Sequence, residues 1–271
     1  MNKMLGNKIL NRVPEITLFF WIIKVLATTV GETAADFLNV NLNLGLTATS
    51  YVMGGLLVIA LLVQFVFIKK YVPASYWIAV VLMSIVGTLI TDNLVDNMGV
   101  SLETTTIIFG IALAMVFVLW YYSEKTLSVH TIYTAKRELF YWAAILFTFA
   151  LGTASGDLLA EGLALGYGIS AVIFLGVIGL IAAAHFYLKL DAILAFWLAY
   201  ILTRPLGASI GDLLSQAPAD GGLGLGTVGT TAIFLSTILL LVVYLSVTKK
   251  DQTPVSELTE EPKSLLGVAE D

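Results

Sequence analysis

The stretch that decides the fold lies at residues 21–36 and reads WIIKVLATTVGETAAD. The same pattern returns at residues 77–92, 142–157 and 197–212, and all copies align without a gap. In every copy a Gly follows the Trp after ten residues, and an Asp follows that Gly after five. Such agreement predicts tandem repeats of one structural unit. The repeated residues are Trp21, Gly31 and Asp36; Trp77, Gly87 and Asp92; Trp142, Gly152 and Asp157; and Trp197, Gly207 and Asp212.

The composition places these repeats in a membrane. The chain has 271 residues, of which 58% are hydrophobic and 12% charged, and its mean hydropathy is +0.93. These values are far too apolar for a soluble domain. Apolar runs of about 20 residues recur along the chain, each long enough to cross a ~30 Å hydrocarbon core, and in lipid they must be helical to satisfy their backbone. The runs lie near 16–38, 46–68, 76–95, 104–122, 138–160, 167–188, 191–214 and 227–247.

The predicted fold class is therefore all-α, a polytopic membrane protein with eight transmembrane helices arranged as four helical hairpin repeats. Because each unit holds two spans, all four copies have the same orientation, unlike the inverted repeats of many secondary transporters. We expect one transmembrane domain at residues 1–248, with repeats at about 15–70, 71–135, 136–189 and 190–248. Residues 249–271 are acidic and are expected to form a solvated tail without fixed structure.

Charge is distributed unequally between the two sides of the predicted membrane domain. Twelve of the fourteen basic residues fall in the N-terminal tail, in the loops from even to odd helices, or in the C-terminal tail. The other two, Lys24 and Arg204, lie inside predicted helices. The positive-inside rule then predicts that both termini lie in the cytoplasm.

With its four Trp-Gly-Asp copies, the chain resembles a bacterial family of membrane-anchored proteins defined by a repeat of unknown function. Members carry four tandem copies of two transmembrane regions with a characteristic Trp. The resemblance covers roughly residues 15–248 and rests on Trp21, Trp77, Trp142 and Trp197 with their Gly and Asp companions. It implies the architecture and a location in the bacterial inner membrane, and it implies no particular activity.

The Trp and Gly residues have structural interpretations. Each Trp lies at the cytoplasmic start of an odd helix, where an interfacial aromatic anchor is expected. Each Gly has a small residue four positions later, such as Ala35 after Gly31, which is the pattern that lets helix backbones approach closely in lipid. Lys24 lies one turn into its helix, and we expect its long side chain to extend back to the cytoplasmic surface.

Polar residues form a stripe on each odd helix at seven, eleven and fifteen positions after the Trp. This spacing places them on one helical face, and facing lipid would be costly for them, so the stripes should face each other inside the bundle. The Asp lies about 22 Å along the helix from the Trp, inside a ~30 Å core. Besides the Asp residues, we predict roles in a pathway or gate for Thr28, Ser84, Thr88, Thr153 and Arg204, and a cation-binding role for Glu32.

The acids of the odd helices outnumber the available bases. Glu32, Asp36, Asp92, Asp157 and Asp212 are faced only by Lys24 and Arg204. A bound cation would compensate them, and because the chain has no Cys, the ligands would be oxygens that suit Mn²⁺, Mg²⁺, Ca²⁺, Na⁺ or H⁺. The alternative is that each Asp only caps the following loop as a repeated determinant of the fold.

Copy 4 departs from the symmetry at Arg204 and Pro205. A proline inside a span removes a backbone hydrogen bond, and a buried arginine requires a carboxylate partner. We expect Arg204 to pair with Glu32 or Asp36, either locking a resting state or standing in for a cation, or serving as a purely structural bridge.

These features favour a transporter or exporter of a cation, with a divalent metal such as manganese as the first candidate and no firmly predicted cofactor. The alternatives are a non-transporting structural or sensory membrane protein and a small-solute permease. The predicted partners are the lipid bilayer and an inorganic cation, with a homo-oligomer possible in principle and no nucleic acid. Because the chain lacks a phosphate-binding loop, a zinc-protease helix motif and a nucleophile elbow, we expect no enzymatic activity.

Overall fold

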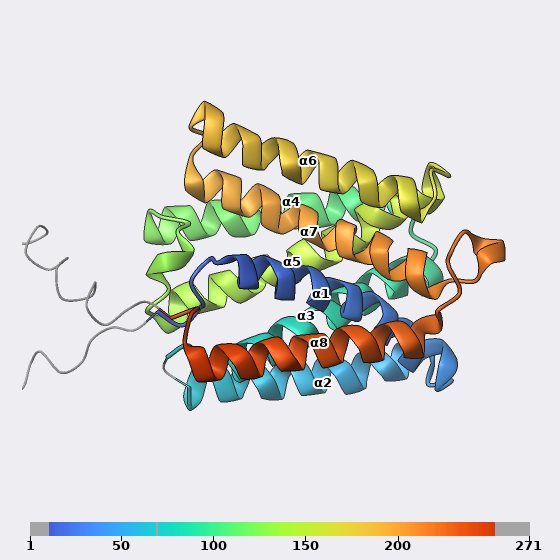
Figure 1. Ribbon diagram of the computed structural model, residues 1–271, viewed down its shortest axis with the longest axis horizontal. Helices are drawn as coiled ribbons and strands as arrows, with labels where there is room; N and C mark the ends of the chain where they lie inside the picture. The colour runs from blue at the N-terminus through green and yellow to red at the C-terminus, as the bar shows by residue number, and fades with distance from the viewer. Residues whose placement is uncertain (1–10, 69, 253–271) are drawn as a thin grey trace, which may run out of the picture.

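The computed structural model describes residues 11–68 and 70–252, and in these ranges eight helices are long and apolar enough to cross a membrane (Figure 1). Their bounds lie within a few residues of the predicted spans, and the described residues contain no strand, which confirms the all-α prediction. The helices are α1 (Leu18–Asp36), α2 (Gly45–Val66), α3 (Pro73–Asp92), α4 (Leu102–Glu124), α5 (Ala135–Asp157), α6 (Tyr167–Leu188), α7 (Ala192–Ser215) and α8 (Gly226–Thr248).

The four odd helices form a closed inner ring. Helix α1 packs against α3, α3 against α5, α5 against α7, and α7 returns to α1. The even helices lie outside this ring (Figure 1). The most apolar stretch of each odd helix is 56–67% buried, against 17–22% for the even helices. The even helices therefore present their apolar side chains to lipid, and the polar stripes of the odd helices face one another.

Each even helix packs on the odd helix of the following repeat rather than on its own. Helix α2 covers α3, α4 covers α5, α6 covers α7, and α8 returns to cover α1. The repeated unit in the sequence is an odd helix followed by an even helix. The helices that pack together are instead an even helix and the odd helix of the next repeat. This arrangement links every copy to the next and closes the ring through the last helix.

The repeated Gly residues set the seams of the inner ring. A methyl group added at Gly87 would collide with Phe149 of the next copy, at 2.6 Å from its Cβ atom. The same offset, from the Gly of one copy to the seventh residue after the Trp of the next, holds all the way round. The expected role of these Gly residues in close helix packing matches this geometry. The pairs are Gly31 with Ser84, Gly87 with Phe149, Gly152 with Arg204, and Gly207 with Thr28.

Three of the odd helices change their winding directly after the repeated Asp. Helices α1, α3 and α5 continue as short π-helices at Phe37–Asn41, Asn93–Asn97 and Leu158–Gly162. Helix α7 instead contains Pro205 and remains α-helical to Ser215, followed by a 3₁₀ turn at Pro218–Asp220. The fourth copy is therefore structurally distinct, as the Arg204-Pro205 pair predicts.

The Trp residues do not serve as lipid-facing anchors, which corrects the interpretation drawn from the sequence. Trp77, Trp142 and Trp197 are only 2–4% exposed, because they pack in an aromatic layer with the Phe or Tyr that precedes each Trp. Trp21 is half-buried and lines a cavity of about 650 Å³ between α1, α6 and α7. The sequence pattern predicts a Trp near the end of a membrane-spanning helix, but packing of the neighbouring helices determines whether that Trp contacts lipid. The preceding residues are Phe20, Tyr76, Tyr141 and Phe196.

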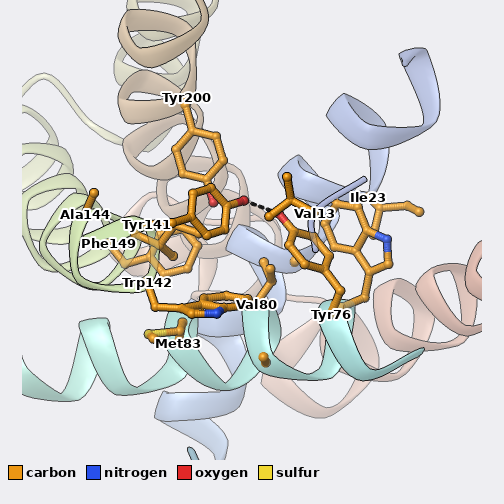
Figure 2. Close-up of a cluster of buried hydrophobic side chains, with 14 of the residues drawn as sticks. Val13, Ile23, Tyr76, Val80, Met83, Tyr141, Trp142, Ala144, Phe149 and Tyr200 are labelled. Atoms are coloured by element: carbon orange, nitrogen blue, oxygen red, sulfur yellow. Dashed lines mark hydrogen bonds between the residues drawn. The ribbon is translucent and has the colours of Figure 1, made fainter. Parts of the chain in front are cut away.

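A segment at residues 11–17 lies across the end of the bundle that carries the chain termini, here called the termini end. Its backbone bonds to Ile132, Tyr71 and Asp251 in three separate connections, and Arg12 pairs with the buried Glu138. Val13 is 4% exposed and lies beside the aromatic layer (Figure 2). The layer and this segment together close the ring axis at the termini end.

Most of the predicted acidic tail, residues 253–271, lies outside the described residues. One of its described acids, Asp251, is not solvated as expected. It is 1% exposed and accepts a hydrogen bond from the hydroxyl of Tyr71, so the tail begins as part of the folded domain.

The glycine seam can be tested with Gly87→Ala, because the added methyl would meet Phe149 and the backbone nitrogen of Ala150 at 3.2 Å, neither of which can move freely. We expect a loss of about 1–3 kcal/mol of stability, measured by thermal unfolding in detergent. Gly110→Ala is the matched control, since its added methyl meets nothing within 4 Å and gains up to ~1 kcal/mol of helix propensity. Equal melting temperatures for the two variants would contradict the seam.

Candidate functional site

Arg204 lies at the centre of the inner ring and contacts the other three copies. Its side chain is fully buried. One terminal nitrogen donates to the backbone oxygen of Thr28 at 2.7 Å, and the other donates to Glu32 Oε2 at 2.7 Å. The second nitrogen also donates to the hydroxyls of Thr153, at 2.8 Å, and Thr88. The predicted pairing of Arg204 with Glu32 is thus confirmed.

This cluster compensates a buried charge with several acceptors. Removing an ion from water costs several kcal/mol, and a buried pair is favourable only when further hydrogen bonds satisfy both groups. Thr88 and Thr153 accept from Arg204 while donating to the carbonyls of Ser84 and Phe149 on their own helices. The charge-assisted bonds to the guanidinium, which are stronger than neutral ones, therefore tie α1, α3, α5 and α7 together.

Helices α5 and α7 approach each other closely at Arg204 and Pro205. A methyl group at Gly152 would overlap both Arg204 and Pro205, so α5 approaches α7 closely at this point. On the other side, the hydroxyl of Thr28 donates to the carbonyl of Thr203 at 3.2 Å. Proline cannot donate a backbone hydrogen bond and disturbs the helical ladder before it, and a side chain from the adjacent copy bonds to a carbonyl in this turn.

The four repeated Asp residues gather at the opposite end of the bundle, here called the aspartate end. Asp36, Asp92 and Asp157 are half-buried, and Asp212 is 7% exposed. Glu32 is an electrostatic neighbour of all four. Among the residues that the structure describes, none of these Asp residues forms an ion pair. The aspartate end is therefore a group of neighbouring carboxylates without a salt-bridge partner among the described residues, although Arg204 is an electrostatic neighbour of Asp157.

These carboxylates do not form a preorganised metal centre. Within residues 11–68 and 70–252, no group of three or more acidic or His side chains is placed to hold a metal ion. Glu32 is occupied by Arg204, and Asp36 accepts a bond from the Gln216 amide at 3.3 Å. The predicted ligand residues therefore share one end of the bundle without three of them being placed around one point in the described structure.

Lys24 was expected to extend to the membrane surface, and this expectation is wrong. Its side chain is fully buried, and its Nζ atom lies 4.0 Å from the ring centre of Phe149 and 4.2 Å from that of Tyr200. In the described structure the Nζ atom has no hydrogen-bond acceptor, and Arg204 is its electrostatic neighbour.

The sequence does contain a signal for this placement. Lys24, Thr28, Glu32 and Asp36 follow one another at intervals of four, which puts Lys24 on the polar face of α1. Tyr200 begins the equivalent series on α7 that continues with Arg204. The prediction for Lys24 was wrong because it considered only the distance of the residue from the membrane surface. It did not consider which face of the helix carries the side chain.

Four segments of the chain match a family model described as Repeat of Unknown Function (DUF347), at residues 19–69, 75–126, 140–190 and 195–251. The chain belongs to this DUF347 repeat family. No curated protein and no solved structure matches it significantly. Each DUF347 repeat holds one odd and one even helix, so the chain is a multi-pass membrane protein with four internal repeats. The cluster around Arg204 takes residues from all four repeats.

The central ion pair can be tested with Arg204→Met, which leaves Glu32 buried and unpaired. We expect a loss of about 3–5 kcal/mol of stability, measured by thermal unfolding in detergent, and partial recovery in the Arg204→Met/Glu32→Met double variant. Arg137→Met is the control, because it removes a bridge to Glu124 nearer the surface and should cost only ~0–1 kcal/mol. If the Arg204→Met single variant unfolds at the same temperature as the wild type, the ion pair does not stabilise the ring.

Proposed function

We propose that this DUF347 protein is a cation transporter of the bacterial inner membrane, with a divalent metal such as Mn²⁺ as its first candidate substrate. The observation that carries the proposal is the aspartate end. Four carboxylates from symmetric positions lie at that end with Glu32 nearby, and none of the four forms an ion pair within the described chain. Acidic residues inside transmembrane bundles mark ion pathways more often than lipid contacts.

The distribution of basic residues gives the proposed orientation. The positive-inside rule places the termini end in the cytoplasm and the aspartate end at the outer surface. Two further acids, Asp96 and Glu161, are electrostatic neighbours of the Asp residues at this end. Such a concentration of one charge raises the local concentration of cations, so the outer end would collect the substrate.

Arg204 takes the role of a tethered cation in this proposal. It neutralises Glu32, which lies one helical turn before Asp36 on α1, so a cation that passes the Asp residues would next reach this ion pair. A bound cation would compete with Arg204 for Glu32 and weaken the bonds that tie α7 to the other inner helices. Substrate binding is thereby linked to the contacts that hold the ring.

The ligand chemistry limits the class of cation. The available ligands are carboxylates, hydroxyls and backbone carbonyls, which suit hard cations. Because no three acidic side chains are already placed around one point in the described residues, the cation would retain part of its water shell or draw the carboxylates inward. A transient site of this kind fits a substrate in transit better than a permanently bound ion.

A second candidate is a structural or sensory membrane protein that transports nothing. The closed termini end favours it, because the aromatic layer and residues 11–17 cover the axis there. In that case the Asp residues would act only on stability. The two candidates therefore differ in what removal of the Asp charges should change.

The discriminating variants are Asp92→Asn and Asp157→Asn, assayed in proteoliposomes loaded with a metal-sensitive dye against Mn²⁺, Mg²⁺, Ca²⁺ and Na⁺. We expect each variant to lower flux of the transported cation by roughly tenfold or more while its melting temperature stays near that of the wild type. Asp220→Asn is the control, since Asp220 is exposed at the same end.

Two results would count against transport. Wild-type protein that moves none of these cations would contradict the proposal directly. A fall in melting temperature with unchanged flux would assign the Asp residues to the fold alone.

A further inference from the structure

Buried hydroxyl groups form a line between Lys24 and the termini end. The line runs through the aromatic layer, where it includes side chains from three different repeats. It ends at a buried carboxylate beyond α8. In order from the centre, its members after Lys24 are Tyr200, Tyr141, Tyr76, Tyr71 and Asp251.

The inner half of the line lies beside the ring axis. Lys24 Nζ is 4.2 Å from the ring centre of Tyr200. The Tyr200 hydroxyl is buried without a hydrogen-bond partner in the described structure, and Figure 2 shows it directed toward Tyr141. The hydroxyl groups of Tyr141 and Tyr76 are hydrogen-bonded to each other (Figure 2).

The outer half of the line leaves the membrane region. The rings of Tyr76 and Tyr71 meet edge to face with centroids 5.6 Å apart. Tyr71 lies between α2 and α3 and donates its hydroxyl proton to Asp251. Burial raises the pKa of the Asp251 carboxyl, which favours its protonated form relative to an exposed carboxylate.

We propose that Lys24 binds and releases a proton during transport and that this line of Tyr residues connects it to Asp251 at the cytoplasmic side. The inference rests on the proposed function and names its coupling ion. A buried amine without an acceptor is an unfavourable place for a permanent charge, and ionisable side chains in series inside a bundle are the usual form of a proton relay.

The transfer requires bridging water molecules, because the structure shows ring contacts rather than hydroxyl hydrogen bonds between Lys24 and Tyr200 and between Tyr76 and Tyr71. When Lys24 takes up a proton, the Tyr200 hydroxyl gives up its own and receives one from Tyr141, and the exchange continues outward. Each hydroxyl ends with the number of protons it began with, so no tyrosinate remains. The Asp251 carboxyl supplies the proton and recovers it from the cytoplasm, and the reverse sequence releases the proton from Lys24.

Electrostatics connect this proton to the cation. Lys24 and Arg204 are neighbours of like charge, so a proton on Lys24 repels Arg204, which holds Glu32. A cation at Glu32 and a proton on Lys24 therefore influence each other through one guanidinium. The other charged or titratable groups on the helices packed around Lys24 are Tyr76 and Asp92 on α3, Lys136, Arg137, Glu138, Tyr141 and Asp157 on α5, Tyr200 and Asp212 on α7, Tyr244 on α8, and Glu32 and Asp36 on α1 itself.

Comparison of the repeats suggests conservative substitutions that interrupt the line of Tyr hydroxyls. Tyr76 and Tyr141 precede their Trp residues, and the equivalent positions in copies 1 and 4 hold Phe20 and Phe196. Tyr76→Phe/Tyr141→Phe therefore installs side chains that the same layer already accommodates, and it removes only two hydroxyls. Tyr51→Phe/Tyr187→Phe is the matched control, because both of these Tyr residues are at least 79% exposed.

The first measurement is independent of any transported cation. Full-length protein labelled with ¹⁵N at the lysine side chains is placed in lipid nanodiscs, and the Lys24 amine signal is identified by its loss in Lys24→Met. After a change of pH, we expect the amine to exchange its proton roughly 10²-fold more slowly in Tyr76→Phe/Tyr141→Phe than in the wild type. If Tyr76→Phe/Tyr141→Phe exchanges the Lys24 proton as fast as the control variant Tyr51→Phe/Tyr187→Phe, the proposed path through the Tyr residues is wrong.

The second measurement tests the coupling. Proteoliposomes with a pH dye and a Mn²⁺ dye should show proton movement opposite to Mn²⁺ movement, lost in Lys24→Met and slowed in Tyr76→Phe/Tyr141→Phe. Mn²⁺ flux without proton movement would overturn the coupling while leaving the proposed function standing. Absence of Mn²⁺ flux in the wild type would count against the proposed function, and the exchange measurement would still decide the path.

Discussion

The structure depends on one buried guanidinium. Arg204 belongs to the fourth repeat, and its bonds reach Thr28, Glu32, Thr88 and Thr153 in the other three. Helices in lipid gain no hydrophobic energy from meeting each other, so close packing and interhelical hydrogen bonds must hold them together. The glycine seams provide the packing, and Arg204, which lies at the seam with Gly152, provides the directed bonds to all three other copies. A charge placed there also fixes the order of the copies, because only one of them can supply it.

Arg204 lies at a position that differs between the four copies, whereas other positions are the same in all of them. The Asp is identical in all copies, and so is the Gly seam. The position seven residues after the Trp holds Thr28, Ser84, Phe149 and Arg204, which differ in size, polarity and charge. The entrance at the aspartate end is thus nearly fourfold, whereas the middle of the bundle is specialised. In the proposed transport function, a cation would therefore meet equivalent carboxylates first and one particular ion pair next.

The sequence predicted the parts of the fold that depend on one helix at a time. Hydropathy located all eight helices in the described chain, and the four-residue spacing located the polar faces, because both follow from local periodicity. The pairing of Arg204 with Glu32 also followed, since few carboxylates lie at a comparable depth. Features set by neighbouring helices were missed. Trp77, Trp142 and Trp197 are covered by other copies rather than lipid. Lys24 contacts aromatic rings instead of reaching the surface, and each even helix packs mainly on the next repeat. No local pattern distinguishes a hairpin that packs on itself from one that packs on its neighbour.

The two ends of the bundle differ in how easily they can change. At the termini end, the aromatic layer and residues 11–17 are densely bonded across several connections. The glycine seams fix the middle, because the backbones there already touch. At the aspartate end, three helices pass into π-helices directly after the Asp, a winding that is rare and recurs at functional positions. A π-turn can be relaxed to α-helical winding by a shift of one residue, which rotates the side chains that follow and alters the helix end that carries the Asp. Inward movement of the carboxylates on these three helices is therefore compatible with a fixed ring, whereas the fourth helix has no π-turn after its Asp.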